Sequence, residues 1–150
     1  MNENSQAIII LCSHLCPPEG INPLSISEWS KVAEALMNHK GVRCIAFVPS
    51  LRSDIVKDFA SRLALKMKIT LYDGLRKLPA EPQKSMENSA HQCENARKSF
   101  YVRGKNLPAK VILIDDLVDS KWTLTVCGYK LMEAGCNEVY PFALADCSEV

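Results

Sequence analysis

Residues 111–125, with the sequence VILIDDLVDSKWTLT, decide how this chain folds. Four apolar residues run directly into Asp115 and Asp116, and an apolar pattern with helical spacing resumes from Leu124. Because the apolar run is continuous rather than alternating, it is typical of a strand that is covered on both faces. We therefore predict a buried strand that ends near Ile114 or Asp115, followed by a helix that begins near Thr123.

The loop between this strand and this helix has the chemistry of a ribose-phosphate site. A helix N-terminus favours an anion, and Ser120 and Thr123 add hydroxyl donors. Asp115 and Asp116 accept hydrogen bonds when ionised, and the vicinal hydroxyls of a sugar supply such donors. For the aspartate pair alone, solvated strand-end acids would be the preferred interpretation. The complete order of strand, acids, hydroxyls and helix is much less expected by chance, so we favour a ribose-5-phosphate site.

The rest of the chain alternates between strand and helix patterns. Short apolar runs predict strands, and the segments between them predict helices by their 3.6-residue period. The strands are expected at 7–11, 43–48, 68–72, 100–102, 111–115 and 138–145. Together these patterns predict one α/β domain over residues 1–150, an open and mainly parallel sheet with helices on both faces. Ligands of such sheets bind beyond the carboxyl ends of the strands, which here means the loops 49–53, 73–82 and 115–123.

Composition narrows the class of protein. The chain has 150 residues, with 18 Lys and Arg against 17 Asp and Glu, so its formal net charge is +1. Nucleic-acid binders usually carry a marked basic excess, so direct nucleic-acid binding by this chain alone is not expected. A cluster of lysines and arginines within 97–110 leaves contact with DNA as an alternative. Seven unpatterned cysteines and no export signal or membrane-spanning run indicate a cytoplasmic protein.

The motif VILIDDLVDSKWT (111–123) resembles the phosphoribosyl-diphosphate (PRPP) motif of type I phosphoribosyltransferases. The resemblance implies that Asp115 and Asp116 face the ribose hydroxyls. It also implies that the 5-phosphate is wrapped by Asp119, Ser120, Lys121, Trp122 and Thr123. The α/β fold of that family agrees with the fold predicted above from periodicity.

The resemblance extends to a diphosphate site. Ser50, Leu51 and Arg52 fall where the diphosphate loop of the family follows an early strand, and Arg76 and Lys77 fall where a flexible loop closes over the diphosphate. In an active enzyme, Asp119 would accept a proton from the base, and Arg52 would help to clamp the diphosphate. The implied cofactor is Mg²⁺ carried by PRPP, with Asp115 and Asp116 as candidate ligands.

A narrower resemblance covers most of the chain after residue 40. The segments 47–64, 79–102 and 113–145 are similar to the phosphoribosyltransferase-like domain at the C-terminal end of some bacterial RecQ-type DNA helicases, which act in DNA repair. The pattern within 82–95 is similar also to ComF-like competence-associated proteins. This resemblance implies a helicase partner or fusion, and the sequence leaves a homodimer open.

Lys121 stands where active enzymes of the family have a glycine, which lets the backbone approach the phosphate closely. We expect the lysine to keep phosphate binding through its charge and to impair catalysis more than binding. For Trp122, both core packing beside the loop and stacking on a base remain open, and packing is the more common role.

Two functions follow from these patterns. The preferred one is a module that binds PRPP or a ribose-5-phosphate nucleotide. The alternative is an active phosphoribosyltransferase that moves the phosphoribosyl group from PRPP to a nitrogenous base. Enzymes of the family carry a hood that recognises the base, and only five residues follow Ala145 here, so we favour the binding module.

Overall fold

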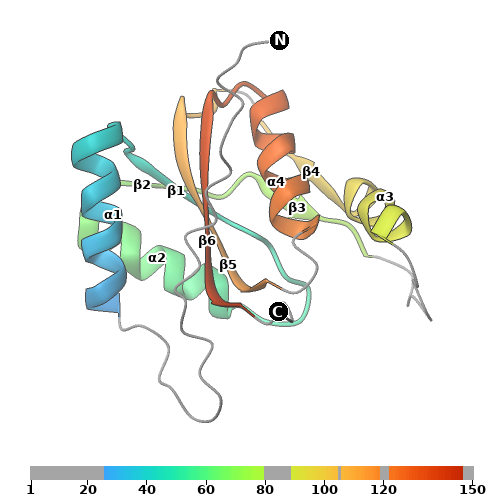
Figure 1. The fold of residues 1–150 in the computed structure, drawn as a ribbon, viewed down its shortest axis with the longest axis horizontal. Coiled ribbons are helices and arrows are strands. Elements are labelled where there is room, and N and C mark those ends of the chain that lie inside the picture. The colour runs from blue at the N-terminus through green and yellow to red at the C-terminus, as the bar shows by residue number, and fades with distance from the viewer. Residues whose placement is uncertain (1–25, 80–88, 105, 119–121, 147–150) are drawn as a thin grey trace.

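The computed structural model describes residues 26–79, 89–104, 106–118 and 122–146 (Figure 1). In chain order the elements are α1 (Ile26–Lys40), β1 (Cys44–Phe47), α2 (Ile55–Met67), β2 (Thr70–Tyr72), β3 (Leu75–Lys77), α3 (Ser89–Ser99), β4 (Phe100–Val102), β5 (Lys110–Val118), α4 (Trp122–Glu133) and β6 (Glu138–Asp146). Within these ranges, no helix is both long and apolar enough to cross a membrane. The predicted strand at 7–11 lies outside the described residues.

The main sheet is parallel throughout and has the strand order β2-β1-β5-β6. The chain runs from β1 through α2 to β2 on one side, and it later returns to β5 on the other side of β1 (Figure 1). The strand order therefore reverses between β1 and β5, and such a switch point opens a crevice outside the carboxyl ends of the two strands. The predicted open parallel sheet is confirmed.

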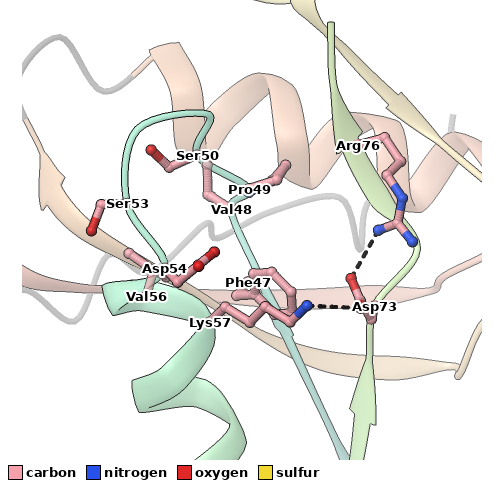
Figure 2. A pocket seen from close by; sticks show the side chains of 10 residues that line it. All are labelled: Phe47, Val48, Pro49, Ser50, Ser53, Asp54, Val56, Lys57, Asp73 and Arg76. Atoms are coloured by element: carbon pink, nitrogen blue, oxygen red, sulfur yellow. Dashed lines mark hydrogen bonds and ion pairs between the residues drawn. The ribbon is translucent and has the colours of Figure 1, made fainter.

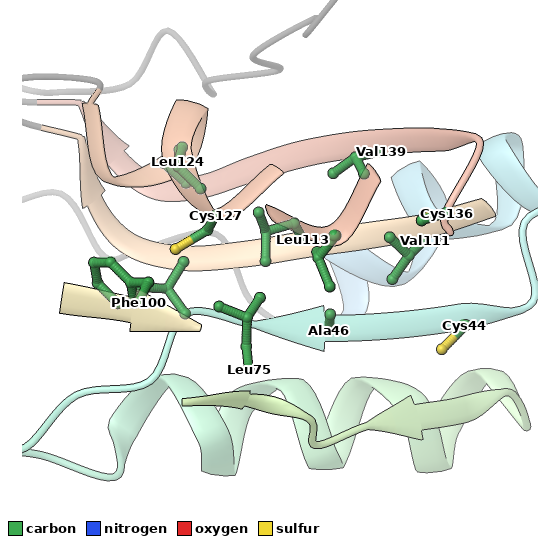
Figure 3. Packing of buried hydrophobic residues seen from close by; sticks show 13 residues of the cluster. Cys44, Ala46, Leu75, Phe100, Val111, Leu113, Leu124, Cys127, Cys136 and Val139 are labelled. Atoms are coloured by element: carbon green, nitrogen blue, oxygen red, sulfur yellow. The ribbon is translucent and has the colours of Figure 1, made fainter. Parts of the chain in front are cut away.

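Helices cover both faces of this sheet, and the alternation of side chains along β5 shows why its apolar run is continuous. Val111 and Leu113 join the α4-side core, whose members from strand and helix are drawn in Figure 3 and include Ala46, Leu124 and Cys127. Ile112 and Ile114 point the other way, into the α2-side core, which is made of Ala33, Val42, Ile45, Phe47, Val56, Ala60, Leu63, Ala64, Ile112, Ile114 and Phe142. Because successive strand residues face opposite ways, a strand between two helical layers must be apolar at every position.

The segment 73–82 was predicted as a loop, and that prediction is wrong for part of it. Residues 75–77 form β3, which pairs antiparallel with β4 and places Leu75 opposite Val102 and Lys77 opposite Phe100. Leu75 and Phe100 are both buried in the α4-side core, and this burial stabilises a strand that local sequence alone would not.

Strand β5 is also longer than predicted. It continues past Asp115 to Val118, because its last residues pair with the end of β6, in the register Val118 to Asp146. The helix that follows begins at Trp122, one residue before the predicted start. The two aspartates are therefore residues of the strand and not of the loop that follows it.

The turn between β2 and β3 depends on Gly74. A Cβ atom placed there would lie 2.2 Å from the Tyr72 hydroxyl and 2.9 Å from the Arg103 carbonyl oxygen. The same turn is held by hydrogen bonds from the Arg103 amide to the Gly74 carbonyl oxygen (2.7 Å) and from the Tyr72 hydroxyl to the Arg103 carbonyl oxygen (3.3 Å). A side chain at position 74 must push both groups away.

We therefore expect Gly74→Ala to lower the free energy of unfolding by about 1–3 kcal/mol in urea denaturation, as overpacking typically does. Gly128→Ala is the matched control. Its Cβ would meet only Val139, at an ordinary 3.7 Å, and alanine is the better helix former, so it should be neutral or stabilising. Equal effects of the two substitutions would contradict a special role for the Gly74 turn.

Candidate functional site

The carboxyl ends of β1 and β2 border a pocket of about 160 Å³ (Figure 2). Its walls come from the end of β1 and the loop after it, from the first turn of α2, and from the turn that joins β2 to β3. The lining residues are Phe47, Val48, Pro49, Ser50, Ser53, Asp54, Val56, Lys57, Asp73 and Arg76. The pocket thus lies at the edge of the sheet where the parallel topology predicts a ligand.

Two cations and two carboxylates line this pocket, and one of the carboxylates, Asp73, pairs with both cations. Arg76 on β3 and Lys57 on α2 both approach Asp73, and Figure 2 shows the three side chains converging. The Arg76 Nη1 atom lies 2.8 Å from Asp73 Oδ1, and the Lys57 Nζ atom lies 3.7 Å from Asp73 Oδ2. Lysine and arginine side chains that converge in this way are suited to phosphate recognition.

The loop after β1 adds hydroxyl groups and a helix N-terminus. Ser50 Oγ accepts a hydrogen bond from the Arg52 amide, and Ser53 Oγ accepts one from the Ile55 amide, each at 3.2 Å. Asp54 precedes α2 without a side-chain capping bond. The positive end of the α2 dipole therefore adds to the attraction for an anion beside these serines.

On β5, the two aspartates lie in different environments. Asp115 is 7% exposed, whereas Asp116 is exposed, and the Asp116 amide donates a 2.8 Å hydrogen bond to Asp115 Oδ1. Burial raises the pKa of Asp115 to about 7, with a further increase from the neighbouring Asp116 carboxylate. Asp115 is therefore partly protonated at neutral pH and can donate as well as accept a hydrogen bond.

The positive charge of Lys77 acts on the carboxyl group of Asp115. Its charge partly offsets the increase in the pKa of Asp115, which places the ammonium group within electrostatic reach of that carboxylate. The same Nζ atom lies 5.5 Å from the centre of the Phe100 ring, over its face, where a cation is attracted by the ring quadrupole. Strand β3 thus carries one cation to the pocket, Arg76, and one toward β5, Lys77.

Only some of the residues predicted to bind the diphosphate line the pocket. Ser50 and Arg76 line the pocket, but Leu51 and Arg52 are exposed and do not line it. Leu51 is 59% exposed, so its apolar side chain makes no core contact of consequence. Arg76 and Lys77 lie on β3 rather than on a loop, because the pairing with β4 holds them there.

The predicted phosphate loop is described only at its ends. Trp122 and Thr123 are the first two residues of α4, and both are half-buried. Asp119, Ser120 and Lys121 lie outside the described residues. The roles assigned to these five positions by sequence remain predictions.

Three charged pocket residues, Asp54, Lys57 and Asp73, were not singled out by the sequence. Lys57 lies partly in solvent and also lines the pocket. Asp73 directly follows the strand 70–72, and a charged residue at the carboxyl end of a parallel strand was the available signal.

The described residues contain no group of three or more His, Cys, Asp or Glu side chains that could hold a metal ion by themselves. Asp115 and Asp116 offer two carboxylates at adjacent positions of β5. Mg²⁺ commonly binds through one or two carboxylates together with the phosphates of a substrate. These residues therefore fit a Mg²⁺ ion that arrives with a diphosphate ligand.

No protein-family model matches this chain, and no curated protein matches its sequence. Its fold is nevertheless similar to solved phosphoribosyltransferases. An adenine phosphoribosyltransferase superposes with a TM-score of 0.51 at 18% identity, over 82% of this chain and 81% of that one. The Saccharomyces cerevisiae adenine phosphoribosyltransferase, complexed with D-2,5-dideoxy-2,5-imino-altritol 1,6-bisphosphate and adenine, gives 0.52 at 18% identity, over 87% and 79% of the two chains.

A third structure, a glutamine mutant from an analysis of an invariant aspartic acid in HPRTs, gives a TM-score of 0.52 at 10% identity, over 83% of this chain and 75% of that one. Identities this low show the fold rather than the activity. The narrower resemblance to the helicase-associated domain stays a prediction from sequence. The chain has the α/β fold of type I phosphoribosyltransferases, with a candidate anion pocket at the carboxyl edge of its parallel sheet.

Proposed function

We propose that this chain binds PRPP or a ribose-5-phosphate nucleotide in the crevice between the carboxyl ends of β1 and β5. The observation that carries the proposal is the placement of two complementary groups across the switch point. The pocket lined by Lys57 and Arg76 adjoins β1, and the aspartate pair lies on β5. The two strands are joined there by a 2.8 Å hydrogen bond from the amide of Val48, which lines the pocket, to the carbonyl oxygen of Ile114, which precedes Asp115.

Each part of the ligand then has chemically matched partners. Asp115 and Asp116 accept hydrogen bonds from the ribose hydroxyls. Lys57 and Arg76, with Ser50 beside them, face a diphosphate, and Mg²⁺ enters with it. The N-terminus of α4, at Trp122 and Thr123, faces the 5-phosphate, because helix N-termini favour anions.

The proposal is tested by calorimetric titration of the full chain with PRPP and Mg²⁺, repeated with AMP and GMP. Saturable binding of PRPP or of one nucleotide is expected, and no heat with any of them would refute the proposal. A panel of nitrogenous bases added to the PRPP complex then tests the alternative, an active transferase. In that reaction diphosphate leaves the anomeric carbon as a base nitrogen enters, so released diphosphate is the readout.

The double variant Asp115→Asn/Asp116→Asn should bind ribose 5-phosphate more than tenfold more weakly. Hydrogen bonds to a charged group contribute about 1.5–3 kcal/mol each, and the amides keep the shape while losing the charge. Asp58→Asn, which breaks the exposed 3.0 Å ion pair to Arg62 on α2, is the matched control and should bind normally. Unchanged affinity in the double variant would show that the aspartates do not touch the sugar.

An association with a RecQ-type helicase is also proposed, on the sequence resemblance of segments 47–64, 79–102 and 113–145 alone. Size-exclusion chromatography of this chain with and without a RecQ-type helicase core tests it. Co-elution is expected, and separate elution at micromolar concentrations would contradict a stable complex. The run without the helicase reports whether the chain is a homodimer.

A further inference from the structure

The pocket at the end of β1 carries its own counterion. Of its ten lining residues, Lys57 and Arg76 are cationic and Asp54 and Asp73 are anionic, so its formal charge is zero. Each aspartate offsets part of the electrostatic field of the two cations. The pocket therefore attracts a free anion less strongly than Lys57 and Arg76 would without the two acids.

Asp73 holds both cations at once. Its two carboxylate oxygens reach different partners, Oδ1 to Arg76 at 2.8 Å and Oδ2 to Lys57 at 3.7 Å (Figure 2). These two cations come from different elements, β3 and α2, and the carboxylate bridges them. A bridging anion with two oxygens has the geometry that a phosphate group would have between the same side chains.

An incoming anion can displace the Asp73 carboxylate from its bridge between Lys57 and Arg76. The Asp73 side chain is 42% exposed, and those of Lys57 and Arg76 are 52% and 35% exposed. Ion pairs this accessible to water contribute little to stability, so breaking them costs the fold little. The pocket volume of about 160 Å³ is below the usual 300–1,000 Å³ of small-molecule sites, so it suits a charged fragment rather than a whole nucleotide.

We infer that Asp73 is an internal counterion that competes with an incoming diphosphate for Lys57 and Arg76. An incoming anion must displace this carboxylate from both cations before it binds them, so Asp73 lowers the affinity of the pocket for anions. A diphosphate brings several oxygens and more than one negative charge, so it outcompetes the aspartate, whereas a smaller anion replaces it with less gain. This inference rests on the proposed function, since it assigns the diphosphate end of the same ligand.

The test is calorimetric titration of the full chain with inorganic pyrophosphate and with inorganic phosphate, without metal, in the wild type and in Asp73→Asn. Asp73→Asn should bind pyrophosphate about three- to tenfold more tightly, the range expected when exposed ion-pair competition is removed. Phosphate should also bind more tightly, by a smaller factor, because it carries less negative charge than pyrophosphate. Asp58→Asn removes the same charge from α2 outside the pocket lining and should change neither affinity.

A second variant keeps the test decisive. Adding Lys57→Gln to Asp73→Asn should abolish most of the gain, because the freed cation is then absent. Thermal melting of each variant verifies that the fold is retained. Weaker or unchanged pyrophosphate binding in a folded Asp73→Asn would overturn the inference and make Asp73 a residue that positions the cations or a bystander.

Titration with ribose 5-phosphate separates this inference from the proposed function. If ribose 5-phosphate fails to bind while Asp73→Asn tightens pyrophosphate binding, the ribose site is refuted and the counterion stands. If ribose 5-phosphate binds but pyrophosphate does not respond to the substitution, the counterion is refuted and the ribose site stands.

Discussion

Asp115→Asn is expected to make the protein markedly more stable above pH 7, with a smaller gain in stability at pH 5 and almost none below pH 3.8. The reason is the burial of Asp115, whose pKa is raised from 3.8 to about 7. The folded protein therefore binds more protons than the unfolded chain between these two values. Its free energy of unfolding falls as pH rises through that window, and the loss is complete above about pH 7.

Because one pKa unit corresponds to about 1.4 kcal/mol, the interval from 3.8 to about 7 is worth roughly 4 kcal/mol between low and high pH. Asparagine cannot ionise, yet its side-chain oxygen can still accept the hydrogen bond from the Asp116 amide. Urea denaturation of both proteins at pH 5 and pH 8 measures the part of this difference that develops between those two values, roughly 3 kcal/mol.

Asp58→Asn is the control, since this exposed acid on α2 contributes an ion pair of less than about 1 kcal/mol. Parallel pH profiles for the wild type and Asp115→Asn would contradict the burial argument. If the profiles diverge as expected, weaker sugar binding by the aspartate variants cannot be attributed to unfolding at neutral pH. Asp115 would then be retained at a cost in stability, which is typical of functional sites.

Phe142→Ala is expected to lower the free energy of unfolding by about 3–5 kcal/mol, the range for deleting a fully buried aromatic ring. Phe142 is 0% exposed, it lies beside Ile114 in the register of β5 and β6, and it belongs to the α2-side core. Two other members of that core, Phe47 and Val56, line the pocket. The substitution therefore leaves a cavity in the layer that supports the pocket.

Tyr129→Ala is the matched control, because this aromatic side chain on α4 is 60% exposed and should change stability by no more than about 0.5 kcal/mol. Urea denaturation of both variants at one pH gives the comparison. A loss below about 1 kcal/mol for Phe142→Ala would mean that the α2-side core repacks around the missing ring.

The sequence determined the architecture because burial on both faces leaves a local trace. The continuous run 111–114 predicted a strand between two helical layers, and those four side chains divide alternately between the two cores. Regular alternation of strands and helices then predicted the parallel sheet, since parallel strands need crossover connections. The edge of the sheet that carries the pocket followed from the same topology.

Tertiary structure alone decided how the polar groups meet. Asp115 is buried and its neighbour Asp116 is exposed. The groups within electrostatic reach of Asp115 include Lys77 on β3 and Cys127 on α4, which come from other parts of the chain. Strand β3 forms because Leu75 pairs with Val102 and packs into the α4-side core. These partners are far from Leu75 in the sequence. Lys57, Asp73 and Arg76 converge for the same reason: each is an ordinary surface residue in its own segment, and a shared pocket depends on distances in space that sequence spacing does not encode.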